Sequence, residues 1–183
     1  MQLELLIPVG AALVVAAVVV LFLRRAGRLV AQTREADAFR KDLGDLAKRI
    51  DASTTAIIES IDGVRRRRVS ADAITDQLTA ALDAVRRYDS EARTLRPPTY
   101  ATGQRERLIG ELERAERALE MVDHGCSILT AVRIGGRELE AQTAIKRGYL
   151  NVLHAREAIL HIALEVDGYR PKTAPRWLVR RRV

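Results

Sequence analysis

Residues 39–64, FRKDLGDLAKRIDASTTAIIESIDGV, repeat apolar side chains at alternating steps of four and three residues. Ser53 or Thr54 fills the only gap in this series. The spacing predicts an amphipathic helix with one apolar face. Its stripe consists of Phe39, Leu43, Leu46, Ile50, Ile57, Ile61 and Val64. No proline interrupts residues 24–64, so we expect the helix to occupy that range.

The same spacing recurs in a segment that we predict to be helical over 71–95. Ser70 is expected to cap its start, and Pro97 and Pro98 to end it. Its stripe is Ile74, Leu78, Ala81, Val85, Tyr88, Ala92 and Leu95. A third helix is predicted over 104–133. Its stripe is Leu108, Leu112, Ala115, Leu119, Val122, Cys126 and Leu129, and it stops at Gly135-Gly136.

A fourth helix is predicted over 137–167, ending at Gly168. Its apolar surface is the widest, which predicts the most buried helix of the four. One stripe holds Ile145, Tyr149, Val152, Ile159, Ala163 and Val166, with Leu150, Leu153, Leu160 and Leu164 beside it.

These segments predict an all-α chain. No segment shows the alternation of a half-buried strand, and short links join the helices. We therefore expect an antiparallel up-down-up-down four-helix bundle over 39–167. Because the stripes repeat close to every 3.5 residues, coiled-coil-like packing is expected.

A different pattern precedes the bundle. Residues 5–23, LLIPVGAALVVAAVVVLFL, contain no charged side chain. As a helix they would span ~28 Å, close to the hydrocarbon thickness of a bilayer. A cleaved signal peptide would have a basic start, a shorter apolar run and a small-residue cleavage site. We therefore predict that residues 1–23 form a single-pass transmembrane anchor.

Basic residues predict the orientation of this anchor. None precedes the span, whereas Arg24, Arg25 and Arg28 follow it directly. Positively charged flanks stay on the cytoplasmic side of a membrane. We therefore expect a single-pass protein of the cell membrane, with its N-terminus outside and its C-terminal domain in the cytoplasm.

Residues 24–38 are expected to form a juxtamembrane helical stalk. The first helix either continues straight out of the membrane or breaks, near Gly44 or between Arg28 and Phe39. A lone exposed helix is marginally stable, so the stalk is a candidate for pairing in a homo-oligomer.

The net charge of +7 is unevenly distributed. Arg65, Arg66, Arg67 and Arg68 form a patch between the first two helices. One interpretation is an open, solvated loop kept apart by charge repulsion; the other is a binding patch for an acidic partner or nucleic acid.

The C-terminal tail, residues 168–183, holds six basic residues and no acidic one. An indole with apolar neighbours and arginines suits the headgroup region of an anionic membrane. The candidate membrane contacts are Arg170, Lys172, Arg176, Trp177, Arg180, Arg181 and Arg182. The alternatives are a tail without a fixed partner and a tail docked on a protein or nucleic acid. Nucleic acid is not expected as a partner, because the main body is acidic and no recognition signature is present.

Catalytic and metal sites find little support. His154, Glu157 and His161 share a helix face, but no His follows a Glu at the three-residue spacing that di-iron bundles use. We expect exposed or half-buried histidines with a carboxylate neighbour. Cys126 falls on the apolar stripe and is expected to be a buried, unreactive side chain. No cofactor, metal or enzymatic activity is predicted.

The layout resembles that of the LemA proteins, which are also small membrane-anchored helical bundles. Residues 24–39, RRAGRLVAQTREADAF, lack the residues characteristic of that family after its anchor, so the resemblance extends to layout alone. The sequence favours a scaffold, adaptor or accessory subunit that acts through protein–protein contacts. A sensor that couples the membrane helix to a dimeric bundle through a polar midpoint, Ser53-Thr54-Thr55, is the alternative. A metal-binding bundle enzyme is a weaker one.

Overall fold

The computed structural model describes residues 3–131 and 136–168. Before Thr33 it describes side chains only at Val20, Leu21, Arg24 and Arg25. Every regular element in these ranges is helical, which confirms the all-α prediction. In chain order they are α1 (Leu3–Arg65), the 3₁₀ turn η1 (Asp72–Ile74), α2 (Thr75–Thr94), the 3₁₀ turn η2 (Thr99–Ala101), α3 (Thr102–Thr130) and α4 (Glu138–Gly168).

The chain divides into two compact units, residues 1–38 and residues 39–183. Among the residues that the structure describes, no helix is both long and apolar enough to cross a membrane. Apart from Val20 and Leu21, the side chains of the expected span 5–23 lie outside the described residues. The transmembrane anchor therefore stays a prediction.

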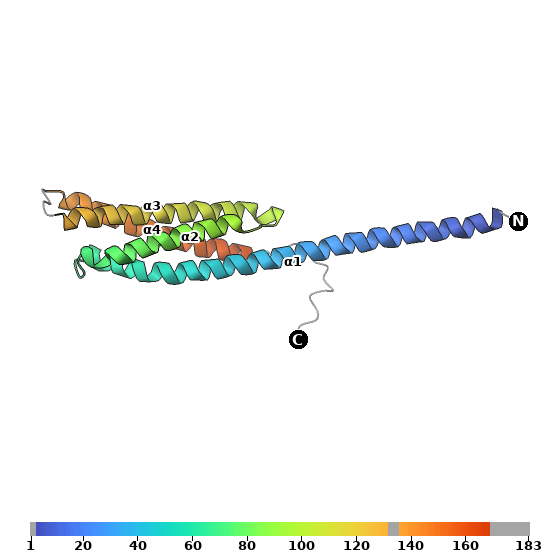
Figure 1. The fold of residues 1–183 in the computed structure, drawn as a ribbon, viewed down its shortest axis with the longest axis horizontal. Helices are drawn as coiled ribbons and strands as arrows, with labels where there is room; N and C mark the ends of the chain where they lie inside the picture. Colours follow the sequence, from blue (N-terminus) through green and yellow to red (C-terminus); the bar gives the residue numbers. More distant parts are fainter. Residues whose placement is uncertain (1–2, 132–135, 169–183) are drawn as a thin grey trace, which may run out of the picture. The chain divides into compact units, whose positions relative to one another are not determined.

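The second unit is a four-helix bundle that consists of the C-terminal part of α1 together with α2, α3 and α4 (Figure 1). Polar contacts give the direction of α1 relative to α2. Arg49 pairs with Glu91, and Ser60 donates to Gln77 at 2.6 Å. Because the α2 partner moves backward along the chain as the α1 residue moves forward, the two helices are antiparallel.

The α2–α3 and α1–α4 pairs are also antiparallel. Arg86 reaches Glu116 at 2.7 Å, and the later Arg93 reaches the earlier Glu113 at 2.7 Å, so α2 and α3 are antiparallel. The return of α4 along α1 is fixed by Arg156, which donates to Asp51 at 2.6 Å, and by Arg67 with Glu138 at 2.7 Å.

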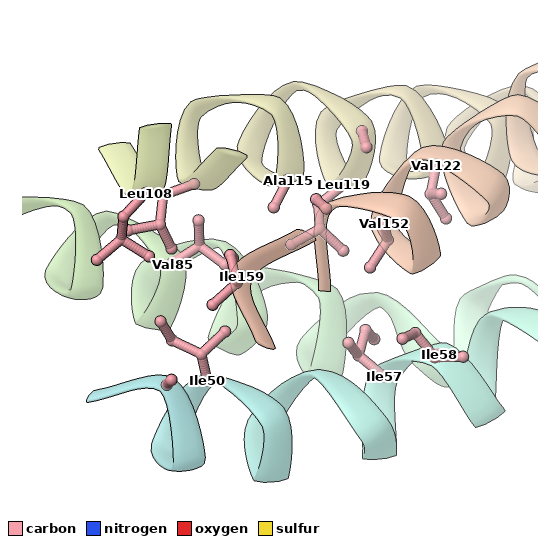
Figure 2. Packing of buried hydrophobic residues seen from close by; sticks show 14 of the residues in the cluster. Ile50, Ile57, Ile58, Val85, Leu108, Ala115, Leu119, Val122, Val152 and Ile159 are labelled. Carbon is pink, nitrogen blue, oxygen red and sulfur yellow. The ribbon is translucent and has the colours of Figure 1, made fainter. Parts of the chain in front are cut away.

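The predicted stripes meet in one apolar core. Figure 2 shows side chains from all four helices pointing toward one another, among them Ile50, Val85, Leu119 and Ile159. All seven apolar stripe residues predicted for α1 are buried. Thr54, in the gap of that stripe, is buried too and donates to the carbonyl of Ile50 at 2.7 Å. Its hydroxyl is thus satisfied inside α1.

Two glycines set the distance between α3 and α4. A Cβ at Gly125 on α3 would stand 2.9 Å from the carbonyl oxygen of Ala141. A Cβ at Gly148 on α4 would stand 2.6 Å from that of Ala118. Both helices carry the pattern Ala-x-x-x-Val/Ile-x-x-Gly, at 118–125 and 141–148, and each glycine lies on the alanine of the other helix. Only glycine permits so close an approach of two backbones.

Two predictions about the helices are wrong. Ser70 does not cap the second helix; residues after it form η1, and α2 begins only at Thr75 without a side-chain cap. Burial of Ala71 and Ile74 anchors this start in place of a cap. The second error concerns α4. Leu150 and Leu164 face solvent, because the core reaches α4 through small residues such as Gly148 and Ala155.

Candidate functional site at the arginine turn

The C-terminus of α1 ends in a six-residue Schellman motif. The amide of Arg68 donates to the carbonyl of Gly63 at 2.8 Å, and the amide of Arg67 donates to that of Val64 at 2.9 Å. These two bonds satisfy carbonyls that the end of a helix leaves without partners. A Cβ at Gly63 would stand 2.8 Å from a methyl group of Val69, so the chain folds back tightly over the helix end.

Arg67 occupies the position that this motif normally gives to glycine. Its φ is +58°, and no other non-glycine residue of the described ranges has a positive φ. An L side chain in this left-handed conformation costs about 1–2 kcal/mol. The side chain is 73% exposed, so burial of its own surface does not offset that cost. Unfavourable backbone conformations of this kind concentrate at functional positions.

Asp62, about one turn before the end of α1, forms ion pairs with three of the four arginines. Its carboxylate lies 2.6 Å from Arg65, 2.7 Å from Arg66 and 3.2 Å from Arg68. The hydrogen bond from Arg65, followed by that from Arg66, holds the pKa of Asp62 below its ordinary value. The arginines also stand at the negative end of the helix dipole, which favours cations there.

The remaining arginine reaches a different helix. Arg67 pairs with Glu138 of α4 at 2.7 Å, and Gln142 donates to the same carboxylate at 2.8 Å. Arg65 lies over the ring of Tyr149 with 4.9 Å between its guanidinium carbon and the ring centroid. Four guanidinium groups thus share two carboxylates, which leaves two positive charges in excess.

Beside this arginine turn, defined as Arg65–Arg68, the described residues leave a cavity of about 850 Å³. Val64, Val69, Ala71, Leu129 and Ile145 form its apolar lining. Polar and charged lining comes from Arg65, Arg67, Arg68, Ser70, Asp72, Thr130, Glu138, Gln142 and Lys146. None of these described lining residues is a cysteine or histidine. The lining suits the recognition of an anionic group with an apolar body.

The prediction of an open loop held apart by repulsion is wrong. Asp62 and Glu138 neutralise half of the charge, and the backbone closes through internal hydrogen bonds. The patch expected to bind an acidic partner is nevertheless brought together on one surface. Arg66, Arg67 and Arg68 each keep more than half of their side chain exposed. Sequence reasoning missed the contributions of Asp62, Glu138 and Tyr149. The four-residue spacing from Asp62 to Arg66 could have indicated the first of these.

The candidate membrane contacts of the tail lie outside the described residues. They are Arg170, Lys172, Arg176, Trp177, Arg180, Arg181 and Arg182.

The histidines of α4 are exposed, as expected. His161 lies 3.0 Å from Glu165, one turn along the helix, so Glu165 and not Glu157 is its carboxylate neighbour. Arg107 of α3 binds the same Glu165 at 2.8 Å. Within the ranges that the structure describes, no group of His, Cys, Asp and Glu side chains is arranged to hold a metal ion.

Cys126 is 3% exposed in the core of α3, which confirms its expected burial. Desolvation by burial raises the pKa of its thiol to about 11, with a smaller contribution from Asp123. Because the thiolate is the reactive form, this side chain is inert at neutral pH.

No known family model matches the chain, and neither a curated protein nor a solved structure shows significant similarity to it.

Proposed function

We propose that this chain is a membrane-anchored helical bundle that acts through protein–protein contacts, as a scaffold, adaptor or accessory subunit. Its contact surface for an acidic protein partner is the arginine turn. One observation carries this assignment: Arg67 holds a left-handed backbone conformation that glycine would adopt without strain, while its side chain faces solvent. A purely structural turn gains from an arginine at that position only the exposed pair with Glu138, which contributes little to stability.

The chemistry of the turn favours recognition over catalysis. Guanidinium groups bind carboxylates through paired, charge-assisted hydrogen bonds. A partner with a row of Asp or Glu side chains would replace Asp62 and Glu138 as acceptors or add to them. Two uncompensated charges beside a cavity with a partly apolar lining also favour a partner that carries an aliphatic or aromatic side chain next to its carboxylates.

Comparative crosslinking of the tagged full chain in its native membranes tests this contact. The Arg66→Glu, Arg67→Glu, Arg68→Glu variant reverses the exposed charges and retains Arg65 on Tyr149. The matched control, Lys41→Glu, Lys48→Glu, Arg87→Glu, reverses three charges elsewhere on the bundle. We expect a crosslinked acidic protein to disappear only from the first variant. Equal crosslinking in both variants would reject the arginine turn as the contact.

The membrane anchor is supported by the uncharged residues 5–23 and by Arg24, Arg25 and Arg28 behind them. In this proposal the bundle lies on the cytoplasmic side. The full chain should stay in the pellet when membranes are washed with alkaline carbonate, and a chain without residues 5–23 should be released. Release of the full chain by the wash would reject the anchor and leave the arginine turn to be judged on its own.

A further inference from the structure

Helix α4 carries a second apolar seam outside the bundle core. Leu139 is 76% exposed, Leu150 42% and Leu164 70%. Leu153 and Leu160 lie between them and are half-buried, and one side of Leu153 packs against the core. Leucines that face solvent along one helix form a surface that favours association.

The outer seam has the regular spacing of a coiled-coil interface. Steps of four and three residues connect Leu139, Thr143, Lys146, Leu150, Leu153, Glu157, Leu160 and Leu164. At 100° per residue this seam is centred about 150° around the helix from the core stripe of Ala141, Gly148 and Ile159. Helix α4 therefore has one seam for its own bundle and another on nearly the opposite face.

We propose that the outer seam of α4 binds the same seam of a second copy of this chain, in antiparallel orientation. The charges carry this assignment. With the twofold axis between Asn151 and Val152, Lys146 of each copy faces Glu157 of the other. The leucines then face one another: Leu150 meets Leu153, and Leu139 meets Leu164. Leu160 meets Thr143.

Other arrangements of the same two helices lose this match. A parallel pair places Lys146 against Lys146 and Glu157 against Glu157. An antiparallel pair shifted by one heptad places Lys146 against Leu164, and Glu157 against Leu153. Only the register centred between residues 151 and 152 pairs both charges and keeps them away from leucine.

Both seam charges are available for such a pair. Lys146 and Glu157 are exposed, and neither forms an ion pair with any described residue of its own chain. Their neighbours on α4 differ: Arg156 binds Asp51, and Glu165 binds Arg107. A second copy supplies the missing counter-charges without disturbing any contact inside the bundle.

Charge exchange tests the register. The full chain is purified in mild detergent and its dimer dissociation constant is measured by analytical ultracentrifugation. Lys146→Glu places two glutamates together at both charged positions of the interface and should raise that constant about tenfold or more. Adding Glu157→Lys should restore it, because the pair is then exchanged and not lost. Lys41→Glu on α1 is the control and should leave it unchanged.

The apolar part is tested with Leu150→Glu and Leu164→Glu together. These side chains are exposed, so the bundle should keep its helix content while the dimer dissociates. Three results would overturn the proposal: a monomeric parent chain, a dimer that survives the leucine substitutions, or a charge exchange that fails to restore it. If the parent chain is a monomer, the outer seam of α4 would instead be covered by the C-terminal tail or by another protein. A surviving dimer would point to the N-terminal segment.

Discussion

Gly148 on α4 lies against the backbone of Ala118 on α3, so that a Cβ at position 148 would stand 2.6 Å from the Ala118 carbonyl oxygen. Backbone atoms cannot rotate away from such a clash, and the two helices would have to separate. The contact between Gly125 and Ala141 repeats this geometry in the opposite direction. The α3–α4 interface therefore depends on two missing side chains.

Gly148→Ala is expected to lower the free energy of unfolding by about 1–3 kcal/mol, the usual cost of overpacking. Denaturant unfolding followed by far-UV circular dichroism measures it. Gly110→Ala is the matched control, because a Cβ there has no atom within 4 Å. As an exposed position inside a helix it should gain about 0.5–1 kcal/mol. Equal effects of the two substitutions would contradict the close approach.

Arg67→Gly is expected to stabilise the fold by up to about 1 kcal/mol. Glycine removes the strain of the left-handed conformation, and the exposed pair with Glu138 contributes little. Arg66→Gly, at a residue without a positive φ, should give no such gain. If the arginine turn binds an acidic partner, Arg67→Gly should also weaken that binding while the melting temperature rises. A fall in stability would show that the turn is not strained.

Acid should weaken the C-terminus of α1. Because Arg65 and Arg66 lower the pKa of Asp62 in the folded chain, this carboxylate stabilises the fold fully above its ordinary pKa of 3.8. That stabilisation is lost as the pH falls through the lowered value. Asp62→Asn should therefore be less stable than the parent chain at neutral pH, and the difference should shrink in acid. A difference that stays constant across this range would rule out the linkage.

Raising the pH above 9 should lower the stability of the fold, because the thiol of Cys126 is buried. Its pKa is about 11 in the folded chain and about 9.0 as an ordinary thiol, so below pH 9 the thiol is protonated in both states. Between these two values the unfolded chain loses its proton first, and the fold loses at most about 3 kcal/mol. Cys126→Ala lacks this loss and serves as the reference. Thiol reagents at neutral pH should modify the parent chain only after denaturation.

Sequence periodicity predicted the apolar core well because large side chains mark a helix face. Leu43, Leu112 and Ile145 fall where the stripes placed them, and all are buried. The same reasoning failed where packing uses small groups. Gly125 and Gly148 carry no hydrophobic signal, although the repeated Ala-x-x-x-Val/Ile-x-x-Gly pattern could have shown that both helices use one motif.

Hydrophobicity also does not say which partner covers a side chain. The periodicity assigned Leu150 and Leu164 to the apolar surface buried in the bundle, but both side chains lie outside its core. At the candidate site, the run of four arginines indicated a patch. Its shape depends on Asp62 within α1 and on Glu138, which is distant in sequence. Local propensity favoured glycine at position 67, so the left-handed arginine could not be predicted.

The antiparallel contact of α1 with α4 has a mechanical consequence. It brings the start of the bundle at Phe39 and its end at Val166 to the same end of the α1–α4 seam. A force that pulls the segments attached at these two points apart would peel α1 away from α4 from that end. It would not slide the two helices along each other. Such a load falls on one layer of side chains at a time, so α1 and α4 should part at low force. The α3–α4 interface, where Gly125 and Gly148 allow close backbone packing, would come under tension later.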